Sequence, residues 1–133
     1  CALPFWIAEG PAHTTESLLD MWVQRDVVRI KIFEQMKRFP LLLCPAAAIP
    51  AFHHGERSWR IEGKLAKYLD AWSYTEWFNL LGMPAAVVPM GHSPEGLPIG
   101  VQIAGKPWQE ELVLSIAEAI EEQRGEWQQP PEI

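Results

Sequence analysis

Hydrophobic residues recur with helical spacing in the first third of the chain. Five of them fall on one stripe at intervals of three or four positions: Leu19, Val23, Val27, Ile30 and Phe33. Thr14 or Thr15 can cap the N-terminus of this helix. We expect the helix to end at about Arg38, because Pro40 follows two residues later. Val28 and Ile32 lie on the opposite side of the stripe, so we expect the back of the helix to be covered as well.

Three short apolar runs further along the chain predict β-strands. They occupy residues 41–44, 85–88 and 99–103. The first run is continuous rather than alternating, which is typical of a strand buried on both faces, and we expect the other two to be buried strands as well. Gly100, inside the third run, indicates a close backbone approach or a bulge. A turn-rich link over residues 90–96 joins the second strand to the third.

Two further helices are predicted beside these strands. Asp70 can cap a helix that runs through Leu81, and Gly82 would end it in a left-handed conformation. The last helix begins near Gln109 and ends at about Arg124. We expect it to bury a stripe formed by Leu112, Ile116 and Ile120.

The segments between these elements carry no sustained period. Residues 53–68 predict a surface loop with one helical turn near 65–68. Residues 1–13 are predicted as an extended strap and 125–133 as a tail, so the chain is a single domain or domain fragment with its body at 14–124. The predicted fold class is α/β, with about three buried strands and about three helices. Such a small sheet leaves edges and faces open, which indicates part of something larger.

Composition limits the classes of function. The chain has 133 residues, of which 48% are hydrophobic, and this supplies one core and no second domain. Its 11 basic and 17 acidic side chains give a formal net charge of −6, which disfavours nucleic acid and anionic membranes as partners. The longest apolar stretch, residues 41–52, contains two prolines and is too short for a membrane-spanning helix.

The cysteines and the start of the chain bear on its compartment. Cys1 and Cys44 make neither a disulfide framework nor a zinc-binding spacing, which favours a reducing compartment, and we expect a cytoplasmic location. The first residues have no basic region and no apolar run of the kind found in signal peptides. They also lack an initiator methionine, so we expect that sequence is missing upstream.

Two catalytic arrangements within the chain compete with plain structural roles. Lys64 or Lys67 could activate Ser58 or Ser73 as a serine–lysine dyad, because a desolvated lysine can act as a base. We prefer the interpretation that both lysines solubilise a loop and that Ser73 occupies the first turn of its helix.

Cys44, followed at some distance by His53 and His54, suggests a cysteine nucleophile or a metal site. A nucleophilic thiolate needs a nearby imidazolium or helix N-terminus, and adjacent histidines in an extended chain point to opposite sides. We therefore interpret Cys44 as a buried apolar filler and the histidines as part of a solvated loop. No metal and no other cofactor is predicted.

Three segments in a fixed order resemble the C-terminal part of the amidase signature family. They are residues 74–89 (YTEWFNLLGMPAAVVP), 96–102 (GLPIGVQ) and 106–112 (KPWQEEL). The resemblance covers roughly residues 41–124, and the last segment is especially similar to the fatty-acid amide hydrolase branch. It implies that the strands belong to a mixed sheet flanked by helices. It also implies hydrolysis or transfer of linear amides by a serine, a second serine in a cis peptide and a lysine.

The catalytic motif of that family has no counterpart in this sequence. The family holds its two serines in a Gly/Ser-rich motif, whereas none of the five serines here has a glycine beside it: Ser17, Ser58, Ser73, Ser93 and Ser115. The resemblance therefore implies the C-terminal third of an amidase with no catalytic residue of its own. Its partners would be the N-terminal catalytic part and a small-molecule amide substrate.

The same resemblance implies one wall of a substrate pocket. The helix bearing Trp72, Tyr74 and Glu76 matches the helix that lines the acyl pocket in the fatty-acid amide hydrolase branch, and Trp108 matches a pocket aromatic there. Trp108 could equally be a hydrophobic staple of the last helix. We expect Tyr74 and Glu76 nearer the pocket, and we expect three residues of the helix to pack inward: Trp77, Leu80 and Leu81.

Glu76 departs from the pattern of a lipid amidase, which would have an apolar side chain at this position. Burying an unpaired carboxylate against hydrocarbon is costly, so we expect a smaller or more polar substrate than a long acyl amide.

A different class of function also fits the sequence. The chain could be a catalytically inactive module that stands alone and serves in binding or assembly, as a homodimer for example. A stand-alone module should bury its strand edges by self-association, whereas a fragment should expose apolar surface or bind its N-terminal complement.

Overall fold

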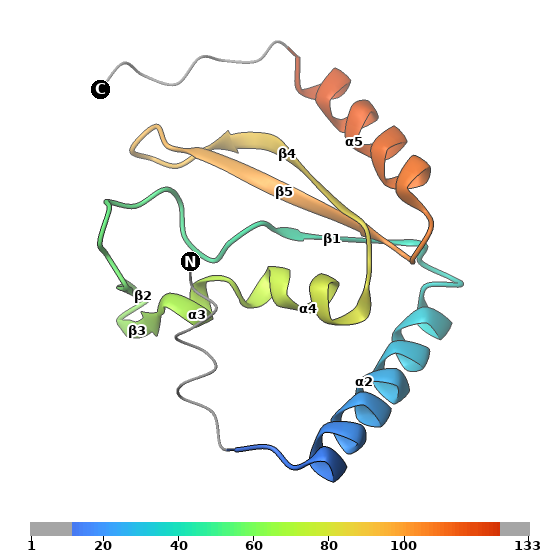
Figure 1. Cartoon of the computed structure of the whole chain (residues 1–133). Helices are drawn as coiled ribbons and strands as arrows, with labels where there is room; N and C mark the ends of the chain where they lie inside the picture. The colour runs from blue at the N-terminus through green and yellow to red at the C-terminus, as the bar shows by residue number, and fades with distance from the viewer. Residues whose placement is uncertain (1–11, 126–133) are drawn as a thin grey trace.

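The computed structural model describes residues 12–125, so most of the predicted strap and the predicted tail beyond Gly125 lie outside the described residues. Three strands form the central sheet in the order β1-β5-β4. Their bounds are Leu41–Pro45 for β1, Pro98–Gly105 for β5 and Ala85–His92 for β4. Both neighbouring pairs are antiparallel, and β5 is the central strand (Figure 1).

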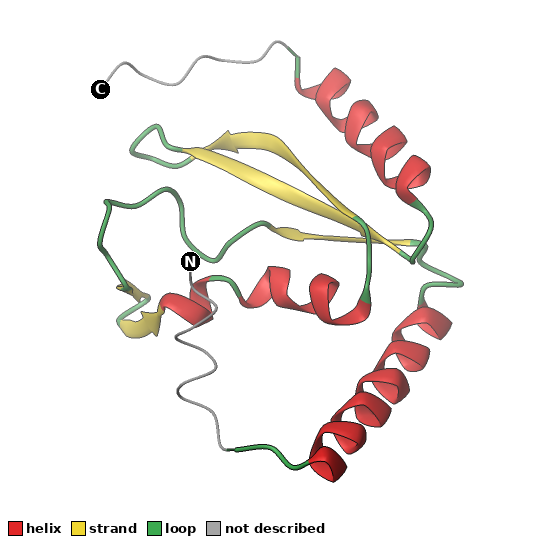
Figure 2. Cartoon of the chain, viewed as in Figure 1, coloured by secondary structure: helices red, strands yellow, loops and turns green. Residues whose placement is uncertain are grey.

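Helices lie on both faces of this sheet. Helix α5 (Glu110–Arg124) covers one face, and α4 (Ser73–Leu81) lies across the other, next to the C-terminal end of α2 (Thr15–Gln35) (Figures 1 and 2). The α/β class with three central strands and three long helices is confirmed. None of the helices in residues 12–125 is both long and apolar enough to cross a membrane.

Both long strands extend beyond their predicted ends. β4 continues past Val88 to His92, so the predicted link over 90–96 is partly strand, and a register shift between Pro89 and Gly91 marks a bulge. Hydrogen-bonded pairing between β4 and β5 extends both strands, because they stay paired as far as His92 and Pro98. The predicted close approach at Gly100 is confirmed, since a Cβ there would lie 2.8 Å from Val87 Cγ1.

Helix α2 begins as predicted and ends earlier. The Thr14 hydroxyl caps it by accepting a hydrogen bond from the Ser17 backbone N–H at 3.1 Å, which decides between the two threonines. The helix ends at Gln35 instead of about Arg38. Met36 is fully buried there, and the backbone tightens into a turn in which the Arg38 N–H donates to the Gln35 carbonyl.

The predicted buried stripe of α2 is wrong for this chain. Leu19, Val23, Val27 and Ile30 are 47–63% exposed, and α2 buries no residue completely. The helix touches the core only near its end, through Phe33 and through Ile32 from the opposite side of the stripe. No described residue covers the other four members of the stripe enough to bury them.

The predicted surface loop over 53–68 contains a β-hairpin. Strand β2 (Ser58–Ile61) pairs antiparallel with β3 (Lys64–Lys67), and the helical turn lies at α3 (Tyr68–Ala71) instead of 65–68. Glu62 and Gly63 form the two-residue turn, with φ angles of 47° and 79°. Two positive φ angles in succession match the twist of a hairpin, which explains why the strands pair here.

Asp70 caps a different helix from the one predicted. Its carboxylate accepts a hydrogen bond from the Lys67 backbone N–H at 2.8 Å, which fixes the start of α3. The helical conformation is then interrupted at Trp72, and α4 begins at Ser73. Gly82 ends α4 in the left-handed conformation with φ 65°, as predicted.

Two apolar clusters make up the core, one on each face of the sheet. Between the sheet and α4 lie Met36, Phe78, Leu81, Met83 and Ala104. Between the sheet and α5 lie Val88, Ile103, Val113 and Ala117. The buried face of α5 is therefore centred on Val113 and Ala117, one position beyond the predicted stripe, whose members Leu112, Ile116 and Ile120 are half-buried.

Candidate substrate-pocket wall

The four predicted pocket residues come from two places in the fold. Tyr74 and Glu76 lie in α4, with Trp72 immediately before it, whereas Trp108 lies in the connection between β5 and α5. That connection joins the central strand to the helix on the opposite face of the sheet (Figure 1). The fold by itself does not bring the four side chains to one face.

Within α4, the predicted residues divide between two sides. Successive residues of a helix are rotated by about 100°, so Tyr74 and Glu76 point about 200° apart. Trp72 and Glu76, four positions apart, share one side. Tyr74 instead shares a side with Phe78 and Trp77 and lines a groove with them. The phase of the helix therefore separates Tyr74 from Glu76 within this chain.

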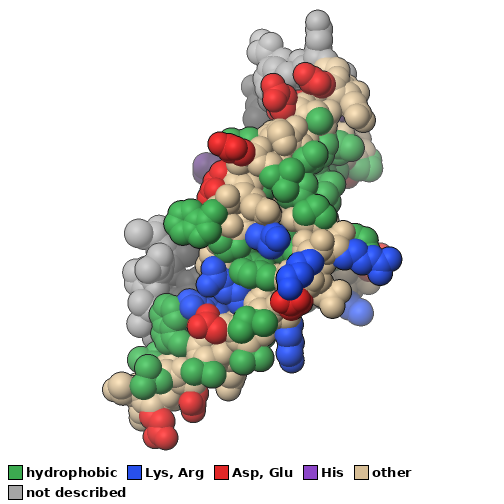
Figure 3. Space-filling model, turned by 90° about the vertical axis from the view of Figure 1, so that its right-hand side faces the viewer, with side chains coloured by type: hydrophobic (Ala, Val, Ile, Leu, Met, Phe, Trp, Pro, Cys, Tyr) green, Lys and Arg blue, Asp and Glu red, His purple; other side chains and the backbone are tan. Residues whose placement is uncertain are grey.

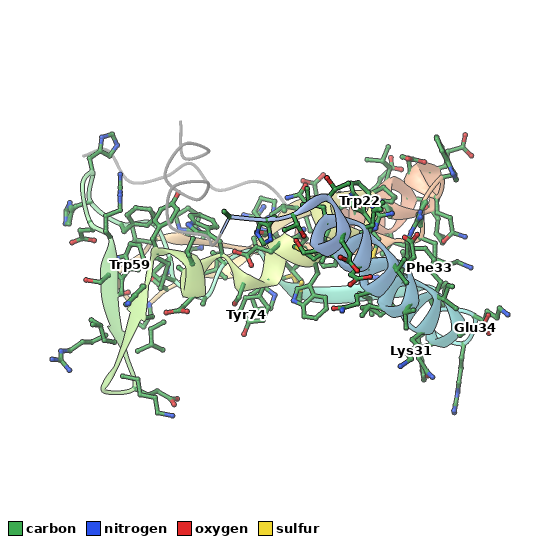
Figure 4. All side chains as sticks on the ribbon, turned by 60° about the horizontal axis from the view of Figure 1, so that its bottom comes forward. Trp22, Lys31, Phe33, Glu34, Trp59 and Tyr74 are labelled. Carbon is green, nitrogen blue, oxygen red and sulfur yellow. The ribbon has the colours of Figure 1, made fainter. Side chains whose placement is uncertain are left out.

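The groove lies between α2, β1 and α4 and has a volume of about 530 Å³. Its walls are formed by Lys31, Ile32, Gln35, Leu42, Leu43, Cys44, Tyr74, Trp77, Phe78, Leu81 and Met83. All but the two polar residues of α2 are apolar or aromatic, and Lys31 and Tyr74 project from their helices in Figure 4. The groove can therefore accept an apolar group, with hydrogen-bonding and charged groups along the α2 side.

Two residues of α4 that we expected to pack inward face outward. Trp77 is 52% exposed and Leu80 is exposed as well, whereas Leu81 is buried as predicted. Phe78 provides the second buried contact with the sheet. The buried side of α4 follows Phe78 and Leu81, which turns Trp77 toward the open groove.

Trp72 belongs to an aromatic cluster. Its ring packs edge-on against Phe52 and Tyr68 with centroid distances of 6.4 and 6.1 Å, and Phe52 in turn contacts Trp59 at 4.8 Å. Trp59 projects from the hairpin, at the end of the molecule opposite Phe33 (Figure 4). The cluster joins the hairpin to the start of α4, so it sets the position of this helix. It was not predicted because the hairpin was not predicted.

Glu76 is exposed on α4, and within residues 12–125 no hydrogen bond or ion pair holds its carboxylate. Trp108 is 91% exposed and has a φ angle of 67°. Large residues rarely adopt a left-handed backbone, and such strain concentrates at functional sites. A hydrophobic staple would pack Trp108 against Val113, so the exposure rules out that alternative.

One polar side chain that was not among the predicted site residues is buried in the middle of the sheet. Gln102 of β5 is paired with Cys44 on one side and Val87 on the other, and its amide oxygen is buried without a hydrogen-bond partner among the described residues. The indole N–H of Trp72 is likewise buried and unpartnered within that part of the chain. In the sequence, the feature that points to this buried polar group is a glutamine inside an otherwise apolar strand.

Cys44 has the surroundings of a structural residue. It is a half-buried free thiol that packs against the apolar cluster under α4, and burial raises its pKa. A raised pKa disfavours the thiolate, so the position suits an apolar filler better than a nucleophile. His53 and His54 are exposed, and the described residues contain no group of three side chains that could hold a metal ion.

The serine–lysine alternatives lack the burial that they need. Ser58 and Lys67 stand opposite each other in the hairpin, but both are exposed. The Ser73 hydroxyl donates a hydrogen bond to the Asp70 carbonyl at 2.9 Å, as expected for a residue at a helix start. An exposed lysine keeps its hydration and is a poor general base at neutral pH.

The chain belongs to the amidase family, whose model, described as Amidase, matches residues 7–114. It is 36% identical over 90 residues to a glutamyl-tRNA(Gln) amidotransferase subunit of Treponema denticola, a match that covers 68% of this chain and 18% of that protein. It is 41% identical over 81 residues to a fatty acid amide hydrolase of Arabidopsis thaliana, covering 61% of this chain and 12% of that protein.

The fold is that of solved amidase signature enzymes. A bacterial aryl acylamidase described as a member of the amidase signature enzyme family superposes with a TM-score of 0.71 and 27% identity, over 95% of this chain and 26% of that enzyme. The resemblance to the amidase signature family is thus confirmed. The chain spans less than a fifth of the length of the two curated relatives described above.

Proposed function

We propose that this chain is the C-terminal segment of an amidase signature hydrolase that acts on carbon–nitrogen bonds of linear, non-peptide amides. It contributes part of the sheet and one wall of the substrate pocket. The nucleophilic serine, the cis-serine and the lysine come from the N-terminal catalytic part, outside this chain. Acylation of that serine followed by hydrolysis with water completes the reaction, with no metal or cofactor in this segment.

One observation carries this proposal: the family model matches residues 7–114, yet no serine of the chain has a glycine neighbour. Family membership supplies the reaction class, and the serine contexts favour a nucleophile located elsewhere. The low cysteine count of this chain fits a reducing compartment and so supports a cytoplasmic location.

The pocket assignment rests on exposed side chains that a second wall would cover. Trp108 holds a strained backbone conformation while almost fully exposed, and Glu76 is exposed on α4, whereas Trp72 is half-buried in the aromatic cluster at the start of that helix. A carboxylate without a partner in the described residues favours a small or polar substrate over a long acyl chain, because desolvating Glu76 against hydrocarbon is unfavourable.

Hydrolysis of a chromogenic anilide tests the proposal. The purified chain is assayed alone and together with the aryl acylamidase lacking the region that this chain matches, and the excised region is the positive control. We expect no turnover by the chain alone and restored turnover in the mixture. Turnover by the chain alone would contradict the proposal, and Ser58, Ser73 and Cys44 would then be replaced in turn.

Substrate preference tests the role of Glu76. In the restored enzyme, Glu76→Met is expected to raise kcat/KM for a long-chain acyl anilide by about tenfold relative to a short-chain one, which corresponds to ~1.4 kcal/mol. Glu118→Met on the exposed side of α5 is the matched control and should leave the preference unchanged. An unchanged preference in Glu76→Met would remove Glu76 from the pocket.

A second candidate function is a catalytically inactive module that self-associates. It is favoured by the outer edge of β1, which has no partner strand in the described residues. Sedimentation of the purified chain over a range of concentrations separates the two candidates, because the module predicts a stable homodimer.

A further inference from the structure

Aromatic contacts connect the β2–β3 hairpin with the start of α4. Trp59 of β2 packs edge-on against Phe52 with a centroid distance of 4.8 Å, and Phe52 packs against Trp72 at 6.4 Å. All three rings are half-buried. Aromatic pairs in this arrangement attract one another beyond the area that they bury. The contacts therefore lead from the hairpin to the residue that precedes α4.

The two ends of this line of contacts are oriented in different ways. The Trp59 indole N–H donates a hydrogen bond to the Glu56 carboxylate at 3.1 Å, which orients that ring. The Trp72 indole N–H is buried and has no partner among the described residues. Within this part of the chain, packing against Phe52 and Tyr68 is therefore what orients the Trp72 ring.

Trp72 is bonded in turn to the first turn of α4. Its carbonyl accepts hydrogen bonds from the Thr75 backbone N–H at 3.0 Å and from the Thr75 hydroxyl at 2.9 Å. A shift of Trp72 therefore moves the start of the helix with it. Tyr74 and Glu76, the predicted pocket residues of α4, lie on either side of Thr75 in the sequence of this helix.

The hairpin itself lies away from the groove. In Figure 1 it lies at the end of the molecule opposite α2 and α5, and this opposite end faces the viewer in Figure 3, where hydrophobic side chains lie between charged ones. Trp59 and Phe33 mark the two ends in Figure 4. None of the hairpin residues lines the groove. The hairpin therefore reaches the predicted pocket wall through Trp72 and α4, and not through the groove.

We infer that Trp59 and Phe52 are positioning residues for the substrate-pocket wall. Through Trp72 they set the place of the first turn of α4, and with it the two pocket residues of that turn. This inference rests on the proposed function. Under that proposal the nucleophilic serine and the lysine lie outside this chain, so a displaced wall weakens binding of substrate and transition state alike. A loss of that kind raises KM and leaves kcat unchanged.

Kinetics of the restored enzyme test the inference. The chain is combined with the aryl acylamidase that lacks its matching region, and KM and kcat are measured with the chromogenic anilide. Trp59→Ala removes the ring, whereas Trp59→Phe keeps a ring without the N–H. Leu65→Ala is the matched control, because Leu65 lies in the same hairpin, is 60% exposed and is outside the aromatic cluster.

We expect Trp59→Ala to raise KM by about fivefold and to change kcat by less than about twofold. Trp59→Phe should bring KM back to about the wild-type value, and Leu65→Ala should leave both constants unchanged. Phe52→Leu should raise KM as Trp59→Ala does. The double variant should show no further increase, because the two residues act on Trp72 through the same contact.

Hydrogen exchange of the chain alone separates positioning from folding. In Trp59→Ala, amides of residues 76–81 in α4 should exchange about tenfold faster than in the wild type. Amides of residues 114–124 in α5 should keep the wild-type rate, because α5 packs on the other face of the sheet. Faster exchange in both helices would mean that Trp59 only supports the fold, and this result would overturn the inference.

Three kinetic results would also overturn it, and they separate it from the proposed function. Unchanged KM in Trp59→Ala, in an enzyme that the wild-type chain restores, rejects the positioning role and leaves the proposed function standing. An equal rise of KM in Leu65→Ala assigns the effect to the hairpin surface instead of the aromatic rings. Failure of the wild-type chain to restore turnover, while the excised region restores it, rejects the proposed function and the inference with it.

Discussion

Helices α2 and α5 have similar apolar patterns and opposite surroundings. Helix α5 has 15 residues and buries Val113 and Ala117 against the sheet, while α2 has 21 residues and buries none. In both cases the spacing of apolar residues predicts a helix correctly. The difference teaches that periodicity reveals which helices have an apolar face, but not whether the cover for that face belongs to the same chain.

The two helices therefore contribute differently to the stability of the chain. Most helical stability in proteins comes from packing of an apolar face. Helix α5 gains this packing from β4 and β5, whereas α2 gains it only near its end, through Ile32 and Phe33. Substitutions on the α5 side should be costly in the isolated chain, and substitutions on the α2 stripe should be nearly silent.

The largest effect is expected for Ile103→Ala under α5. Ile103 is fully buried between the sheet and α5, so the variant leaves a cavity and should lower the free energy of unfolding by about 2–5 kcal/mol in urea denaturation. Ile30→Ala, which removes the same atoms from the exposed stripe of α2, is the matched control and should cost less than about 0.5 kcal/mol. Equal losses in both variants would show that α2 is covered in solution.

The tightness of the α5 contact is tested by adding one carbon. A Cβ at Gly105 would lie 2.7 Å from Val113 Cγ2, so Gly105→Ala should destabilise the chain by about 1–3 kcal/mol. Gly91→Ala is the control, because nothing lies within 4 Å of its Cβ position. In a double-mutant cycle, Val113→Ala should relieve part of the cost by removing the clashing methyl. Additive losses would mean that α5 does not pack on β5 this closely.

Local chemistry accounts for what the sequence predicted correctly. The Thr14 cap and the Gly82 helix end each depend on one residue type and its immediate neighbours, and the close approach at Gly100 was predictable because only glycine leaves room for a neighbouring strand there. The hairpin was missed because a Glu-Gly turn is a weaker signal than Asn-Gly and its strands have four residues each. The break at Trp72 was missed because the aromatic cluster that accompanies it depends on Phe52 and Tyr68.

The candidate site was less predictable than the fold. Trp72, Tyr74, Glu76 and Trp108 were chosen by resemblance, and the structure separates Tyr74 from Glu76 by the phase of α4. Trp77 and Leu80 were expected inside because aromatic and aliphatic side chains usually find cover in their own chain. Here they border surface that a second part of the enzyme would cover under our proposal.

Cys44 is half-buried: it packs under α4 and also lines the groove. Burial raises its pKa, so in a Cys1→Ser background its alkylation rate should reach half-maximum at a pH above that of an ordinary thiol. The protonated thiol is favoured by folding, so its stabilising contribution is present below the unfolded pKa and is lost as pH rises through the folded pKa. Alkylation in urea is the control and should show the ordinary pH dependence. An ordinary midpoint in the folded chain would mean that the groove leaves Cys44 solvated.

The smallest effect is expected on the α2 stripe, where it is most informative. Val23 is 62% exposed, so Val23→Lys should change the free energy of unfolding of the isolated chain by less than about 0.5 kcal/mol, measured by urea denaturation. The matched substitution on α5, Val113→Lys, places a charge against Ile103 in the core. We expect this variant not to fold, so that it shows no cooperative transition in urea. If Val23→Lys leaves the stability of the isolated chain unchanged but weakens its assembly with the truncated aryl acylamidase, the stripe is an interface. The two helices then differ in what covers their apolar faces: the same chain for α5 and another part of the enzyme for α2. If it destabilises the isolated chain by several kcal/mol, α2 folds back onto its own chain, and the comparison between the two helices fails.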